Sequence, residues 1–110
     1  SKLSAKKSKN IEYLEYEKKD FLDKFMQDLL QRNISSILVE GGQQTLNAFI
    51  GKNLFDELVL YTAPMILGKG SKDTMSSKAT ISIKKSPKLK LIKLESFGDD
   101  IKTTYYNPNA

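Results

Sequence analysis

The segment from residue 36 to residue 46, SILVEGGQQTL, constrains the fold of this chain more than any other. Ile37, Leu38 and Val39 form a continuous apolar run, which predicts a buried strand over residues 35–39. After Gly42 the apolar residues return at helical spacing, which predicts a helix over residues 43–52. The first turn of a helix carries unpaired backbone N–H groups at the positive end of the helix dipole. A strand that passes through two glycines into a helix is therefore a candidate site for a phosphate-bearing cofactor.

Composition excludes several kinds of chemistry. The 110 residues contain no cysteine and no histidine, so we expect no soft-metal site, no disulfide and no Ser-His-Asp or Cys-His arrangement. The formal charge is +5, but Arg32 is the only arginine, and proteins that read nucleic acids favour the arginine fork. No apolar run reaches the roughly 18 residues of a membrane helix, and no secretory signal is present. We therefore expect a cytoplasmic protein that binds neither nucleic acid nor membrane.

The remaining pattern predicts an α/β fold. A second helix is expected over residues 20–32, whereas the lysine-rich residues 1–10 are expected to be flexible. Further strands, rich in β-branched and aromatic residues, are expected at residues 11–16, 58–62, 88–94 and 101–106. Strands that alternate with helices and end in a hairpin indicate a mostly parallel sheet with an antiparallel C-terminal hairpin. We expect a single domain over residues 1–110.

A loop follows the strand expected at residues 58–62. It spans residues 64–70, and its apolar residues Met65, Ile66 and Leu67 suggest that it packs against the domain. Because it lies at the end of a strand, it is also a candidate to border the ligand site.

An ordered set of short motifs resembles a known family. The motifs cover residues 20–108 and are similar to the later part of the reductase domain of bifunctional riboflavin-biosynthesis deaminase/reductases. This family has a dihydrofolate-reductase-like fold, a three-layer sandwich of which we expect only a part here. We expect a C-terminal fragment, because the earlier strands and the zinc deaminase domain of the family are absent from this chain. The motifs read ILVEGG at residues 37–42, FI at 49–50, FDEL at 55–58, APMILGKG at 63–70 and FGDDI at 97–101.

The resemblance implies an oxidoreductase of riboflavin biosynthesis. Its reaction is the NADPH-dependent reduction of 5-amino-6-(5-phosphoribosylamino)uracil, a phosphorylated pyrimidine, to the ribitylamino form. The resemblance assigns substrate binding to Glu40. It assigns the NADPH pyrophosphate to Gly41 and Gly42, to the backbone of Gln43 and Gln44, and to a further phosphate contact from Thr45. No catalytic residue is assigned, and a homodimer is expected.

Each of these assignments has an alternative. The two glycines could serve only a tight turn, Glu40 could hold a loop or cap the helix, and Thr45 could be an ordinary helix-surface residue. The chain could also be an inactive, non-catalytic fragment or an assembly module that dimerises through exposed sheet edges. Related reductases of the neighbouring diaminopyrimidinone phosphate share the Glu-Gly-Gly pattern, so they remain a third hypothesis.

Overall fold

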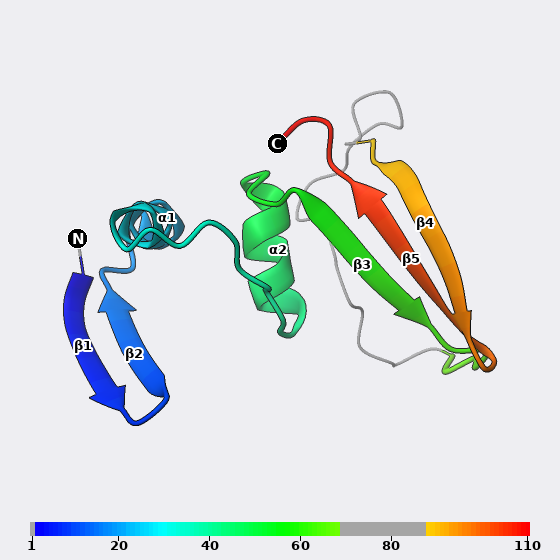
Figure 1. Ribbon diagram of the computed structural model, residues 1–110, viewed down its shortest axis with the longest axis horizontal. Coiled ribbons are helices and arrows are strands. Elements are labelled where there is room, and N and C mark those ends of the chain that lie inside the picture. The colour runs from blue at the N-terminus through cyan, green and yellow to red at the C-terminus, as the bar shows by residue number, and fades with distance from the viewer. Residues whose placement is uncertain (1, 69–87) are drawn as a thin grey trace. The chain divides into compact units, whose positions relative to one another are not determined.

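The computed structural model describes residues 2–68 and 88–110. They form two compact units, Ser1–Val39 and Glu40–Ala110, each described by itself below (Figure 1). None of the helices in the described ranges is long and apolar enough to cross a bilayer. That the two units belong to one domain over residues 1–110 stays a prediction.

A hairpin opens the first unit. Strand β1 (Lys2–Ser8) pairs antiparallel with β2 (Ile11–Tyr16), and the Ser8 hydroxyl donates a 3.4 Å hydrogen bond to the Ile11 carbonyl across the turn. The strand over residues 11–16 is thus confirmed. No strand was expected before it, and β1 forms because a β-ladder joins backbone groups, so a polar, lysine-rich segment can pair with a partner strand. The flexibility expected of residues 1–10 stays a prediction.

Helix α1 (Phe21–Gln31) follows the hairpin and confirms the helix expected over residues 20–32. Its apolar stripe buries Leu22 and Leu29, whereas Leu30 is 75% exposed. The helix ends where Asn33 enters the left-handed region at φ 58°. Periodicity therefore located the helix and part of its buried face.

A polar clamp joins α1 to β2. The guanidinium of Arg32 donates two hydrogen bonds to the carboxylate of Glu12, at 2.7 and 3.0 Å, and its Nε lies 3.2 Å from Asp28. These two carboxylates raise the pKa of Arg32 above its usual range. Asp28 also accepts a hydrogen bond from the hydroxyl of Tyr16. The only arginine of the chain thus has a structural role.

Tyr16 is the aromatic centre of this unit. Its ring is 8% exposed and meets Phe21 and Phe25 edge to face, with ring centroids 6.0 and 6.1 Å away. Burial, together with the hydrogen bond to Asp28, raises the pKa of Tyr16 to about 12. Folding therefore favours the neutral, protonated hydroxyl of Tyr16.

The second unit is a helix and a three-stranded sheet. It contains α2 (Gln43–Gly51), β3 (Glu57–Thr62), β4 (Lys90–Phe97) and β5 (Asp100–Tyr106). β5 lies between β3 and β4 and is antiparallel to both (Figure 1). The hairpin of β4 and β5 turns at Gly98, where φ is 60°, and confirms the predicted antiparallel C-terminal hairpin.

One predicted strand is wrong. Residues 34–42 belong to no helix or strand, although an apolar strand was expected over residues 35–39. A parallel strand gains its stability from neighbouring strands, and no described strand pairs with this segment. All strand pairs that the structure describes are antiparallel, so the mostly parallel sheet is not confirmed.

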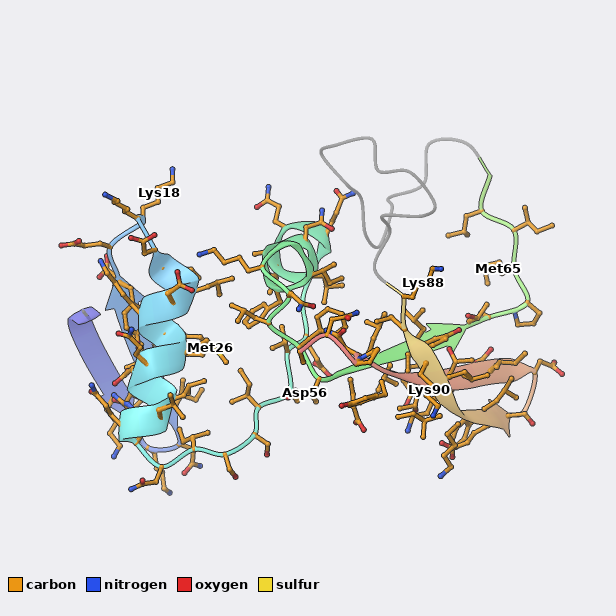
Figure 2. The ribbon with its side chains drawn as sticks, turned by 90° about the horizontal axis from the view of Figure 1, so that it is seen from above. Lys18, Met26, Asp56, Met65, Lys88 and Lys90 are labelled. Atoms are coloured by element: carbon orange, nitrogen blue, oxygen red, sulfur yellow. The ribbon has the colours of Figure 1, made fainter. Side chains whose placement is uncertain are left out.

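A buried asparagine ties the end of the chain to the loop between α2 and β3. The side chain of Asn107 is 1% exposed, and its amide donates to Asn53 Oδ1 at 2.7 Å and to the Phe55 carbonyl at 2.9 Å. Its backbone N–H donates to the carbonyl of Asp56, which lies directly before β3 (Figure 2), at 2.8 Å. The Asn107 Oδ1 accepts from the Asn109 N–H at 3.1 Å. Every polar group of this amide is therefore paired.

Replacing Asn107 should destabilise this unit. Asn107→Asp keeps the shape but removes both amide N–H donors and places a carboxylate beside two acceptors. We expect the free energy of unfolding to fall by about 2 kcal/mol or more, measured by urea denaturation of the whole chain. Asn10→Asp, in the exposed turn between β1 and β2, is the matched control and should change it by less than about 0.5 kcal/mol. Equal effects of the two changes would contradict the role of the buried amide.

Tyr16 should make stability depend on alkaline pH. Its pKa is about 12 in the folded chain and 10.0 without the fold, so the unfolded chain releases the proton first as pH rises. The stability that Tyr16 contributes is complete below pH 10 and is lost as pH rises from about 10 to about 12.

Urea denaturation of the parent chain and of Tyr16→Phe across this range tests the effect. The stability difference between them should narrow from pH 10 to pH 12, and a constant difference would contradict the assignment. Tyr13→Phe is the control, because the Tyr13 ring is 59% exposed on the same strand.

Candidate functional site

The N-terminus of α2 carries no cap from a side chain. Gly42 is the N-cap residue, with φ −80° and ψ −174°, and the first turn contains no acidic residue. The Leu46 N–H makes a 3.1 Å bond to the Gly42 carbonyl. The preceding N–H groups, those of Gln43, Gln44 and Thr45, therefore have no intrahelical acceptor. They form a small positive site at the end of the helix dipole.

The two glycines before α2 differ in what they permit. Neither lies in the left-handed region, where the described glycines are Gly68 and Gly98. A Cβ on Gly41 would lie 2.9 Å from the Cβ of Thr45, whereas a Cβ on Gly42 would meet nothing within 4 Å. Under the alternative in which the glycines serve only a tight turn, a left-handed φ angle would be the reason for glycine. Neither Gly41 nor Gly42 has such an angle. A side chain at position 41 would collide with Thr45, so this position requires glycine. At position 42 there is room for a side chain among the described residues.

Glu40 lies directly before this turn and is exposed. Its carboxylate neither caps α2 nor makes a hydrogen bond or ion pair with any residue in the described ranges. The structure thus gives no support to the alternative in which Glu40 holds a loop or caps the helix. The strand that was expected to end at Glu40 is not formed, so its contact with substrate stays a prediction.

The other predicted cofactor residues follow in the first turn of α2. Gln44 and Thr45 are exposed, and Gln43 is half-buried. Local chain geometry alone brings all of them to the helix end. The contact between Thr45 and Gly41 was not predicted, although the i, i+4 spacing across a helix start could have indicated it.

The loop after β3 does not pack as predicted. Met65, labelled in Figure 2, is 69% exposed, and Ile66 and Leu67 are 98% and 71% exposed. The prediction from their apolar character is therefore wrong for these residues, and the end of the loop, Gly70, lies outside the described residues. That the loop borders the ligand site stays a prediction.

The part of the chain that the structure describes offers no candidate metal centre beside the site. Across residues 2–68 and 88–110, no group of three or more histidine, cysteine, aspartate or glutamate side chains is placed to hold a metal ion. What the site offers chemically is a set of backbone donors suited to an anion, next to one carboxylate.

Comparison with protein families gives a match over most of the chain. The family model described as RibD C-terminal domain matches residues 3–103. Among curated relatives, the riboflavin biosynthesis protein RibD of Haemophilus influenzae is 33% identical over 94 residues, which cover 86% of this chain and 25% of that protein. RibD of Aquifex aeolicus is 32% identical over 80 residues, covering 73% of this chain and 22% of that protein. The chain thus spans about a quarter of the length of these relatives.

Solved structures give the same result for the fold. Acinetobacter baumannii RibD, form 2, superposes with a TM-score of 0.71 at 26% sequence identity, over 77% of this chain and 24% of that one. Form 1 of the same protein gives a TM-score of 0.70 at 23% identity, a likeness of fold alone.

Proposed function

The chain belongs to the RibD C-terminal domain family, and on this premise we propose that it holds the pyrophosphate of NADPH at the N-terminus of α2. It is part of the C-terminal reductase domain of a riboflavin biosynthesis protein, as the sequence motifs indicated. Its fold is the α/β fold of that domain, consistent with the dihydrofolate-reductase-like class. Membership of the family supports a nucleotide cofactor in general, and we propose that this cofactor is NADPH.

The bare position of Gly42 carries this proposal. An N-cap is commonly Ser, Thr, Asp or Asn, whose side-chain oxygen pairs with the N–H groups of the first turn. Gly42 supplies no such oxygen, and space is open where its side chain would be. A pyrophosphate oxygen can therefore approach the N–H groups of Gln43, Gln44 and Thr45, and no acidic side chain of the first turn repels it.

The reaction that we propose is a hydride transfer to the ribosyl group of 5-amino-6-(5-phosphoribosylamino)uracil. NADPH, when bound, would supply the hydride to the sugar carbon that carries the amino nitrogen, which is an imine carbon in the open form, and that nitrogen would take up a proton from solvent to give the ribitylamino group. The backbone at α2 binds and orients the cofactor, and the Glu40 carboxylate accepts hydrogen bonds from the pyrimidine or the ribosyl hydroxyls. The matched segment covers only 25% of the Haemophilus influenzae relative, so we propose that the complete reaction also uses segments outside this chain. A homodimer and a cytoplasmic location belong to the same proposal.

A negative charge at position 42 should weaken cofactor binding. Gly42→Asp places a carboxylate at the proposed phosphate position, and NADPH affinity should fall at least about tenfold, or about 1.4 kcal/mol. The change should leave the fold intact, because space at this position is open. Fluorescence of the nicotinamide during titration of the chain with NADPH measures the affinity. A variant that binds NADPH as well as the parent would refute the site.

Alanine at position 42 separates the effect of a negative charge on NADPH binding from the effect of added side-chain volume. Gly42→Ala should lose less affinity than Gly42→Asp, because alanine adds a methyl group without a charge. Thermal unfolding of both variants checks that the fold is retained.

Glu40 should act on substrate and not on cofactor. Glu40→Gln keeps the shape but loses the charge of the acceptor, so affinity for the ribosylaminopyrimidine phosphate should fall about tenfold in calorimetry. NADPH affinity should stay within about twofold of the parent. Glu57→Gln, an exposed acid at the start of β3, is the control. Loss of NADPH affinity in Glu40→Gln would show that the residue serves the fold or the cofactor instead.

A further inference from the structure

We propose that Thr45 is a positioning residue that acts by packing over Gly41, and that its hydroxyl is not a phosphate ligand. The inference rests on the proposed function, because what Thr45 positions is the turn that leads into the cofactor helix. It assigns separate roles to the two glycines: Gly41 accommodates Thr45, and Gly42 leaves room for the ligand.

The side chain of Thr45 lies against Gly41 with all its atoms. A Cβ on residue 41 would be 2.9 Å from Cβ, 3.1 Å from Oγ1 and 3.2 Å from Cγ2 of Thr45. The atom in closest approach is fixed directly to the backbone of α2, so a change of side-chain rotamer does not move it away. A larger residue at position 41 must therefore move the turn and the helix relative to each other.

The backbone conformation of Gly41 gives no other reason for a glycine. Among the described residues, the glycines with positive φ are Gly68 and Gly98, so Gly41 has a conformation that other residues can adopt. Steric contact with Thr45 is what remains. The contact joins residue 41, which precedes the N-cap Gly42, to residue 45 in the first turn of α2.

This contact sets the entry of the chain into the helix before any ligand arrives. Holding donors in place in the free protein lowers the cost of ordering them on binding. Thr45 contributes its methyl and Cβ to this arrangement, while its N–H group belongs to the first turn of α2 and has no intrahelical acceptor. Within residues 2–68 and 88–110 its hydroxyl makes no hydrogen bond.

Two substitutions at position 45 separate packing from ligation. Thr45→Val keeps the branched shape without the hydroxyl, whereas Thr45→Ser keeps the hydroxyl without the methyl. We expect NADPH affinity of Thr45→Val to stay within about threefold of the parent, since the shape is retained. A loss of about tenfold or more in Thr45→Val, with parent affinity in Thr45→Ser, would overturn the proposal in favour of a hydroxyl ligand.

A double-mutant cycle tests the contact itself. Gly41→Ala should weaken NADPH binding about tenfold, because the added methyl displaces the turn. Thr45→Gly should restore most of that loss in the Gly41→Ala background, since it removes the opposing Cβ. Gly42→Ala combined with Thr45→Gly is the control pair and should show additive effects. Additive effects of Gly41→Ala and Thr45→Gly would overturn the proposal.

Thermal unfolding of the same variants distinguishes a failure of the cofactor site from a failure of the contact between Gly41 and Thr45. If the parent chain does not bind NADPH, the proposed cofactor site fails, and coupling between positions 41 and 45 in unfolding still shows whether the contact exists. If the parent binds NADPH and Gly41→Ala binds equally well, the proposed function stands and the positioning role of Thr45 is refuted.

Discussion

The buried amide of Asn107 is the interaction on which the unit from Glu40 to Ala110 depends. A polar group shielded from water is stable only when its hydrogen bonds are made, and this amide makes them to the Asn53 side chain, the Phe55 carbonyl and the Asn109 N–H. Its own N–H extends the pairing of β3 and β5 to Asp56. The last residues of the chain therefore fix the loop that joins α2 to the sheet.

In the first unit, Ser1–Val39, the polar groups that join the elements are charged. Among the described residues the buried apolar side chains are Tyr16, Leu22, Leu29 and Phe49, so neither unit has a large apolar core. In the first unit Arg32 links Glu12 of β2 to Asp28 of α1 with short, directional bonds. Polar contacts of defined geometry thus set how each helix meets its neighbouring strands or loops.

The candidate site at the start of α2 depends on the missing side chain of Gly42 and on the packing of Thr45 against Gly41. Gly42 supplies no side chain, so the N–H groups at the start of α2 are left for an anion. The side chain of Thr45 leaves no room for a Cβ at Gly41. Both effects are steric, and neither follows from the flexibility that is usually attributed to glycine.

What the sequence determined by itself was local or carried by ordered motifs. Apolar spacing located α1 and α2, β-branched and aromatic runs located β2 to β5, and the spacing from ILVEGG to FGDDI identified the family. Tertiary structure decided which strands pair. Residues 35–39 read as a strand but have no partner among the described residues, and the lysine-rich segment Lys2–Ser8 is a strand because β2 pairs with it. It also decided that Gly41 faces Thr45 and that Asn107 is buried, because a sequence pattern gives the periodicity of each element and not the atoms that it will meet.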